Sequence, residues 1–286
     1  MEGKYIKVNN VSVYVEEYMP KSYGKDTPDV CLIHGLVSSV HSFKPVIPKL
    51  AEFARVIALD LPGFGKSEKG TGYLYSYENY AATIAELMEI LSVKKITAVG
   101  HSMGGQICLY LAKYYPDLIS ELVLMAPSSY VGRSSIRLRL ATYLPLAPLC
   151  ARFLINRSDL RNIFKSVVYD EKHADDESYQ IYVAPFKDKA FYQSLIGLIR
   201  HREGDLKDED LYGIAHHTLL LWGENDQVVP LSIGERLSTQ LSQARFITYP
   251  KTGHLLPKEQ PEKALTEMIN FLEERGRFQR LPKKEI

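Results

Sequence analysis

The sequence predicts an α/β protein in which helices flank a mostly parallel sheet and an inserted helical segment interrupts the pattern. Short apolar segments bounded by glycine or proline alternate with segments whose apolar residues recur at helical spacing. Such alternation predicts right-handed crossovers between parallel strands, with helices covering the sheet. The alternation stops near residue 128 and resumes near residue 213, so one sheet domain is expected to contain one insertion.

The expected elements follow in a regular order along the chain. Alternating residues at 4–9 and 11–18 predict two strands joined by a hairpin turn at Asn9-Asn10. Continuous apolar runs predict buried strands in DVCLIHG (29–35), RVIALD (55–60), KKITAVG (94–100), ISELVLMAP (119–127), HTLLLWGEND (217–226) and RFITYP (245–250). Helices are expected at 43–53, 77–91, 105–115, 232–241 and 261–275.

Residues 1–127 and 213–286 are therefore expected to form the core domain, and residues 128–212 a helical cap. An insertion between sheet strands usually covers the carboxyl ends of those strands, where open α/β folds bind ligands. The leucine, tyrosine and proline content of the cap predicts an apolar pocket that opens and closes. The stretch RSSIRLRL has three arginines over seven positions, and we interpret it as a solvated cap face rather than a membrane-facing helix.

Composition excludes several classes of protein. A net charge of +1 gives no electrostatic reason to expect nucleic acid as a partner. The polar N-terminal segment lacks the apolar run of a signal peptide, and no segment approaches a membrane span. We therefore expect a cytoplasmic location without stable membrane anchoring. Cys31, Cys108 and Cys150 are scattered and lie in apolar contexts, which predicts buried free thiols rather than disulfides or a metal site.

The segment GHSMGG (100–105) places Ser102 directly after a buried strand and directly before a helix. A nucleophile in this position needs a very sharp turn, which brings the residues on either side close together. Gly100 and Gly104 remove the Cβ atoms that would collide there. The position of this G-x-S-x-G string between strand and helix indicates a nucleophile rather than a chance match.

A serine nucleophile needs a base and a group that orients the base. Of eight histidines, only His254 lies late in the chain and after the carboxyl end of a strand. His101, His173, His201 and the pair 216–217 are less suitable, because they are adjacent to the serine, in the insertion, or at the start of a strand. Asp226 follows the strand LLLWG and is the expected orienting carboxylate, with Glu224 as the alternative.

The fourth component of such a site is a pair of backbone N–H donors for an oxyanion. One donor is expected at Met103, directly after the nucleophile. The other is expected in HGLVSS after the first parallel strand, where Gly35 allows the loop to bend and Leu36 provides the N–H. Main-chain donors make the side chain at position 36 relevant to pocket shape and not to charge stabilisation.

These motifs together resemble the α/β-hydrolase superfamily, in its branch of small cap-bearing esterases and related hydrolases. The segments that carry the resemblance are LIHGL, DLPGFGKS, GHSMGG, LWGENDQVVP and the GH at 253–254. They extend over nearly the whole chain apart from the cap, and the Ser–Asp–His order is the one expected of this family. The resemblance implies Ser102, Asp226 and His254 as catalytic residues and the backbone N–H groups of Leu36 and Met103 as oxyanion donors.

Departures from other branches narrow the expected activity. Serine at position 102 disfavours dehalogenases and epoxide hydrolases, which use an aspartate nucleophile. The HGGG, HGGPG and HGxGPG motifs of hormone-sensitive-lipase-like esterases, proline iminopeptidases and C–C bond hydrolases are absent, and HGLVSS stands in their place. The resemblance implies a carboxylesterase that acts on small-molecule esters of short to medium acyl chain, with no metal or organic cofactor.

Two kinds of alternative remain open from the sequence. The same three residues serve lactonases, thioesterases, acyltransferases or perhydrolases, and C–C bond hydrolases. A ligand receptor on this fold is the alternative outside the enzymes. The acyl pocket in the cap decides among the enzymes, and neither that pocket nor the oligomeric state follows from the sequence.

Overall fold

Within residues 3–24 and 27–277, which a computed structural model describes, eight strands form one sheet. The strands lie in the order β1-β2-β4-β3-β5-β6-β7-β8. β1 and β2 pair antiparallel with their neighbours, and all pairs from β4 to β8 are parallel. The mostly parallel sheet is as predicted. The strands are β1 (Lys4–Val8), β2 (Val11–Tyr18), β3 (Asp29–Ile33), β4 (Arg55–Leu59), β5 (Ile96–His101), β6 (Ile119–Met125), β7 (Thr218–Gly223) and β8 (Ala244–Tyr249).

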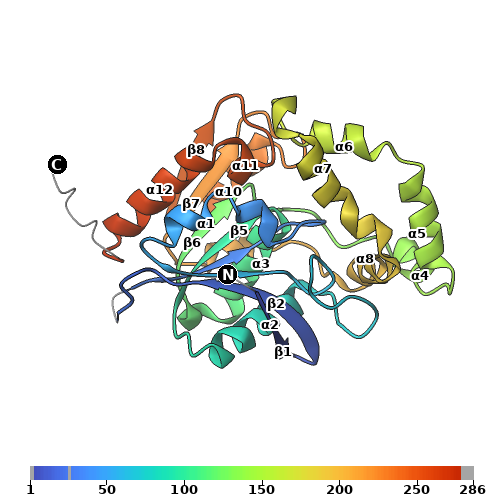
Figure 1. Cartoon of the computed structure of the whole chain (residues 1–286), viewed down its shortest axis with the longest axis horizontal. Helices are drawn as coiled ribbons and strands as arrows, with labels where there is room; N and C mark the ends of the chain where they lie inside the picture. The colour runs from blue at the N-terminus through green and yellow to red at the C-terminus, as the bar shows by residue number, and fades with distance from the viewer. Residues whose placement is uncertain (1–2, 25–26, 278–286) are drawn as a thin grey trace.

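Helices cover both faces of this sheet and form a separate group at one end of the molecule (Figure 1). α2, α3 and α10 pack on one face, and α1 and α12 pack on the other. The helices are α1 (Ile47–Leu50), α2 (Tyr77–Ile90), α3 (Met103–Tyr114), α4 (Ile136–Ala141), α5 (Ala147–Asn156), α6 (Leu160–Ser166), α7 (Asp176–Val183), α8 (Lys189–His201), α9 (Asp208–Tyr212), α10 (Leu231–Gln240), α11 (Leu256–Glu259) and α12 (Pro261–Glu274).

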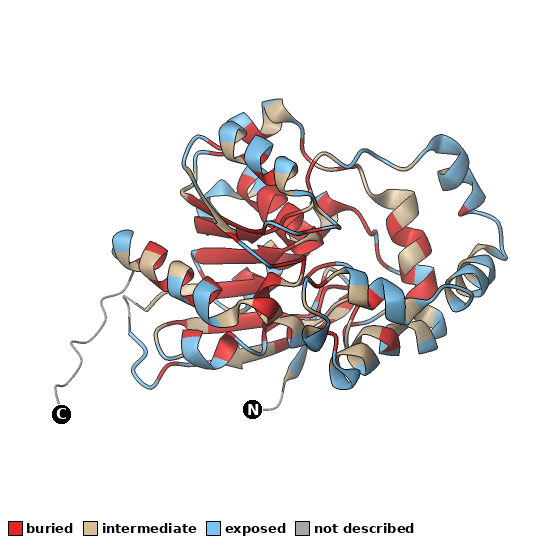
Figure 2. Cartoon of the chain, turned by 90° about the horizontal axis from the view of Figure 1, so that it is seen from above, coloured by how far each residue is buried: buried red, intermediate tan, exposed pale blue. Residues whose placement is uncertain are grey.

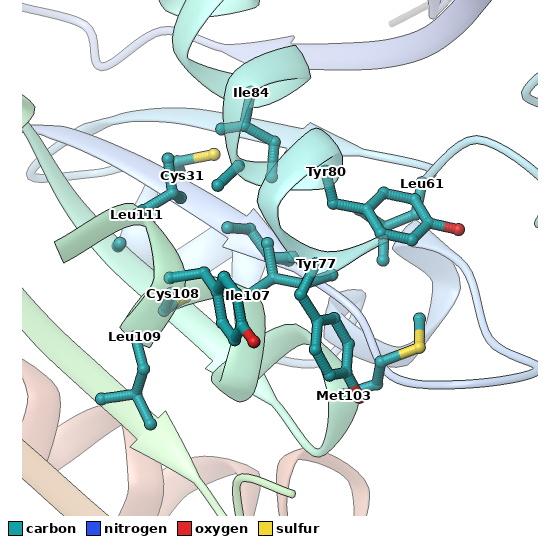
Figure 3. Packing of buried hydrophobic residues seen from close by; sticks show 14 of the residues in the cluster. Cys31, Leu61, Tyr77, Tyr80, Ile84, Met103, Ile107, Cys108, Leu109 and Leu111 are labelled. Atoms are coloured by element: carbon teal, nitrogen blue, oxygen red, sulfur yellow. The ribbon is translucent and has the colours of Figure 1, made fainter. Parts of the chain in front are cut away.

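Successive residues of the central strands face opposite sides of the sheet. In β3, Cys31 and Ile33 join the hydrophobic cluster under α2 and α3, whereas Val30 and Leu32 join the cluster under α12. Burial on both faces explains why these strands are continuously apolar. The sheet is the buried centre of the molecule (Figure 2). Figure 3 shows the first cluster, with residues of α2 beside residues of α3: Tyr77, Tyr80, Ile84, Met103, Ile107, Cys108, Leu109 and Leu111.

One predicted turn is confirmed and one predicted helix is corrected. Asn9 and Asn10 have φ values of 48° and 61°, as a two-residue hairpin with a primed turn requires. The helix expected at 43–53 is instead a 3₁₀ turn (Val40–Phe43) followed by the single turn of α1. Pro45 and Pro48 explain the difference, because proline lacks the N–H that a continuous helix needs.

Between β6 and β7 the chain forms α4–α9 and no strand, as the sequence predicts for this segment, which we call the helical insertion (residues 128–212). Most of its helices gather at one end of the molecule, beyond the sheet (Figure 1). α4 and α5 contain no buried residue. The predicted core segment 213–286 extends beyond the described residues, so its part at 278–286 lies outside them.

The three cysteines differ in environment, which corrects one prediction. Cys31 and Cys108 are buried free thiols as expected, and burial raises the pKa of the Cys31 thiol to about 12. Cys150 is exposed. It lies on α5, which presents apolar residues to the outside as well as to α8, so an apolar sequence context did not indicate burial here.

Candidate active site

The turn at Ser102 has the strained backbone that a nucleophile elbow requires. Ser102 has φ 53° and ψ −119°, between the end of β5 and the start of α3. A Cβ atom on Gly100 would lie 2.5 Å from the Gly104 carbonyl oxygen, and a Cβ on Gly104 would collide with the Ile33 carbonyl. Neither position can therefore hold a larger residue without a backbone shift. The turn holds the serine at the N-terminus of α3, where helix N–H groups are free of intrahelical partners.

Asp226 and His254 come together although they are separated along the chain. His254 Nδ1 lies 2.7 Å from Asp226 Oδ2, and both residues are buried. The second carboxylate oxygen of Asp226 accepts hydrogen bonds from the backbone N–H groups of Val228 and Val229, each at 2.8 Å. With its proton held at Nδ1 by the carboxylate, the imidazole presents Nε2 as a hydrogen-bond acceptor. This is the arrangement that a general base needs.

Glu224 does not take this role in the structure. Its carboxylate is exposed and accepts a hydrogen bond from Thr248 Oγ1 at 2.9 Å. Of the two acids considered after β7, Asp226 is the one that reaches His254.

His254 lies against the elbow that carries Ser102. His101, directly before Ser102, has its Nε2 at 2.8 Å from the His254 carbonyl oxygen, and the two rings are 4.8 Å apart. Burial and the neighbouring His254 lower the pKa of His101 to about 3, so its ring is neutral. From the sequence, His101 was judged less suitable as the base because it is adjacent to the serine. The structure instead shows that its ring contacts the loop of His254 and supports it.

The loop after β3 lies directly against the elbow. A Cβ atom on Gly35 would be 3.1 Å from Ser102 Cβ, so the loop containing Gly35 and Leu36 adjoins the serine. Leu36 is 47% exposed and Met103 is buried at the first position of α3. The loop of Leu36 and the start of α3 at Met103 therefore both adjoin Ser102, and the role of their N–H groups stays a prediction.

His34 holds this loop in place and was not among the residues singled out from the sequence. Its Nε2 accepts the backbone N–H of Leu61 at 2.9 Å, so Nδ1 carries the proton and donates to the Gly35 carbonyl at 2.7 Å. Burial lowers the pKa of His34, which keeps the ring neutral. Its place directly before Gly35 in LIHGL was the available sequence signal.

Glu259 is a second functional residue that was not singled out from the sequence. This buried carboxylate accepts the N–H of Gly253 at 3.1 Å and the N–H of Tyr169 at 2.8 Å. The N–H of His254 donates to the Val167 carbonyl at 2.8 Å. The loop that carries His254 is thus bonded to residues 167–169 of the helical insertion. The only sequence signal was an acid shortly after His254, in HLLPKEQP.

A cavity lies at the junction of the helical insertion with the core, away from His254. Its volume is about 270 Å³. Residues such as Tyr73, Tyr75, Leu144 and His201 line it, and Ser102, Asp226 and His254 do not. The candidate active site is the hydrogen-bonded group around His254 and not this cavity, because the groups that could react lie there.

The fold and this site define an α/β-hydrolase, and comparison with known proteins agrees. The sequence model of the protein family described as alpha/beta hydrolase fold matches residues 28–146. The sequence model of the family described as TAP-like protein matches residues 200–278. The chain is 39% identical over 265 residues to the uncharacterized hydrolase YugF of Bacillus subtilis (strain 168), which covers 93% of this chain and 96% of that protein. The chain belongs to the α/β-hydrolase family, and it is a hydrolase.

More distant relatives include enzymes with named substrates. The chain is 28% identical to the 2-hydroxy-6-oxo-2,4-heptadienoate hydrolase of Pseudomonas putida, over 85% of this chain and 88% of that protein. It superposes on the meta-cleavage product hydrolase from Pseudomonas fluorescens IP01 with a TM-score of 0.76 at 25% identity, covering 96% and 98% of the two chains. A thermophilic esterase from Thermogutta terrifontis gives a TM-score of 0.76 at 22% identity, covering 96% and 99%, which shows a shared fold alone.

Proposed function

We propose that this protein is a serine hydrolase that cleaves carboxylic esters of short to medium acyl chain through an acyl-enzyme on Ser102. The observation that carries the proposal is the buried 2.7 Å contact between His254 Nδ1 and Asp226 beside the strained Ser102 turn. A buried carboxylate is costly unless it is fully hydrogen-bonded, and Asp226 accepts three bonds. A fixed imidazole beside the turn that carries the partly buried Ser102 supports acyl transfer.

In the proposed reaction, Ser102 Oγ attacks the ester carbonyl while His254 Nε2 takes the hydroxyl proton. Asp226 holds the imidazole in the required tautomer and stabilises the imidazolium. The N–H groups of Leu36 and Met103 donate to the oxyanion of the tetrahedral intermediate. His254 then protonates the leaving alcohol, and afterwards it activates the water that releases the acid from Ser102.

We propose that the helical insertion acts as the cap over this site and selects the acyl group. Its hydrogen bonds to the His254 loop support this role, since they join the insertion to the proposed general base. The expected ligand is a small-molecule ester, and the reaction needs no metal or organic cofactor. We further propose a cytoplasmic location, on the ground of the sequence features given above.

The test is the hydrolysis of p-nitrophenyl esters of increasing acyl length by the native protein and by Ser102→Ala. We expect turnover to be lost in Ser102→Ala, because no other group at the elbow can form the acyl-enzyme. The variant should unfold at about the native temperature, since within the described residues the Ser102 side chain makes no capping hydrogen bond to α3. Near-native turnover by Ser102→Ala would refute the assignment of the nucleophile.

A second candidate is hydrolysis of a C–C bond in a ring-cleavage product. The relatives named as 2-hydroxy-6-oxo-2,4-heptadienoate and meta-cleavage product hydrolases favour it. The absence of HGxGPG disfavours this activity in the sequence but leaves it open as an alternative, and these relatives support that alternative. Measuring kcat/KM for 2-hydroxy-6-oxo-2,4-heptadienoate and for the ester panel with one preparation distinguishes the two. A higher value for the dienoate would overturn the ester assignment.

A further inference from the structure

α4 and α5 of the helical insertion present an unusual number of exposed apolar side chains. Nine large apolar residues between positions 136 and 154 are 49–66% exposed, and neither helix contains a buried residue. Soluble proteins rarely leave so many neighbouring apolar side chains uncovered unless the surface binds a partner. From the sequence, the start of this segment was interpreted as a solvated face rather than a membrane-facing helix; in the structure its leucines are exposed too, which favours the membrane-facing alternative. Examples at over 60% exposure are Ile136, Leu140, Tyr143, Leu144 and Leu154.

The exposed side of α5 faces away from the core. Ala151 and Ile155 are partly buried against the main hydrophobic cluster. At 100° per residue, Leu149 and Phe153 lie on the opposite side of the helix, where they are 58% and 55% exposed. Figure 1 shows α4 and α5 at the end of the molecule farthest from α12. This apolar side is therefore open to a large partner from outside.

The charge of the same segment is strongly one-sided. Residues 131–158 include five arginines and no aspartate or glutamate, in a chain with a net charge of only +1. Arg133, Arg137 and Arg157 are exposed, while Arg139 and Arg152 are half-buried. We call residues 133–157 the basic apolar surface.

We propose that the basic apolar surface docks reversibly on an anionic lipid bilayer. The arginines can bind the phosphate headgroups of such a membrane. The exposed leucines and aromatic residues beside them can enter the acyl-chain region beneath the headgroups. A second copy of this chain fits less well, because a symmetric contact would bring two sets of arginines together. Among the described residues no helix is long and apolar enough to cross a bilayer, and surface docking requires none.

The test is sedimentation with vesicles of phosphatidylglycerol and phosphatidylcholine in equal parts, against vesicles of phosphatidylcholine alone, without substrate. We expect the native protein to bind the mixed vesicles, to bind the neutral vesicles much more weakly, and to be released by high salt. Because no catalytic step is measured, the result is independent of the proposed ester hydrolysis.

Two double variants separate the apolar and the charged contributions. Leu144→Gln with Leu154→Gln should weaken partitioning about 100-fold, since two leucines no longer enter the acyl layer. Arg137→Gln with Arg157→Gln should weaken it about 25-fold on mixed vesicles and hardly at all on neutral ones. The matched controls lie outside the surface and should bind like the native protein: Tyr5→Gln with Tyr212→Gln, and Lys94→Gln with Lys95→Gln.

Three outcomes would overturn the proposal. The first is no binding of the native protein to the mixed vesicles. The second is a dimer without vesicle binding that becomes monomeric in Leu144→Gln with Leu154→Gln, which would assign the surface to a second copy. The third is an unchanged vesicle affinity of that variant together with a raised KM for a soluble ester, which would assign the leucines to the substrate path.

Discussion

At the scale of single residues, the site depends on where the hydrogen bonds of Asp226 go. One carboxylate oxygen accepts hydrogen bonds from two backbone N–H groups, and the other accepts a hydrogen bond from His254 Nδ1–H. The backbone bonds fix the carboxylate so that only one orientation of the imidazole satisfies it. Asp226 therefore acts on the tautomer of His254 as well as on its charge.

This geometry predicts a large effect of Asp226→Asn. The amide oxygen would keep the hydrogen bonds from the backbone N–H groups of Val228 and Val229. This orientation turns the amide NH₂ toward His254. The imidazole would then accept at Nδ1 and carry its proton on Nε2, where it cannot take the proton of Ser102. We expect kcat for an ester to fall about 10⁴-fold, by analogy with the serine protease triad.

Glu224→Gln is the matched control, because Glu224 is exposed and bonds to Thr248 instead. It should retain native turnover. If Asp226→Asn lost only a few-fold while Glu224→Gln lost the activity, the carboxylate assignment would be wrong.

At the scale of elements, α11 connects the proposed base to the helical insertion. Glu259, at the end of α11, bonds both to Gly253 and to Tyr169, and His254 bonds to Val167. A Cβ atom on Gly253 would come within 2.7 Å of the Tyr169 nitrogen, so the two segments are in direct backbone contact. Lys258 adds an ion pair with Asp175 at the start of α7. The position of His254 therefore depends on the insertion as well as on β8.

Glu259→Gln tests this connection. Glutamine retains the size but provides only one acceptor oxygen, and its NH₂ would face an N–H donor. We expect a fall in the free energy of unfolding of about 1–3 kcal/mol, because a buried charge-assisted bond is lost. We also expect kcat to fall about tenfold at nearly constant KM, since the base is displaced while the acyl pocket is unchanged.

The exposed Glu262→Gln on α12 is the control for Glu259→Gln, and both are measured by steady-state kinetics and by denaturant unfolding. A purely structural role would lower stability and leave kcat unchanged. Equal behaviour of the two variants would show that the contact with Tyr169 and Gly253 does not position His254.

At the scale of the whole molecule, buried neutral histidines make stability depend on pH. His34 and His101 have pKa values lowered by burial, to about 3 for His101. In the unfolded chain both bind a proton near pH 6.5, so below that pH the unfolded state binds more protons than the folded state. Their contribution to stability is complete above pH 6.5 and is lost as the pH falls.

We therefore expect the free energy of unfolding to decrease as the pH falls from 6.5 toward 4. Each of the two histidines adds a slope of up to about 1.4 kcal/mol per pH unit. Urea unfolding at several pH values measures this slope, and His101→Asn should reduce it by up to one histidine's share. An identical slope in the native protein and in His101→Asn would contradict the prediction.

Much of the fold could be predicted because its signals are local. The apolar runs of β3, β4, β5 and β7 are bounded by glycine or proline, and burial on both faces requires such continuous runs. The glycines around Ser102 likewise record a close approach within a few residues of the chain. The helix expected at 43–53 was wrong because two prolines outweigh its apolar spacing.

By itself, the sequence determined the order of strands and helices, the strained turn at Ser102 and the acids and histidines available to it. Only the tertiary structure decided that Asp226 rather than Glu224 meets His254, that Glu259 bonds to the insertion, and that the leucines of α4 and α5 face outward. The physical reason is range. Strand period and glycine sterics act between neighbours in the chain, whereas hydrogen-bond partners and burial depend on residues that only folding brings together.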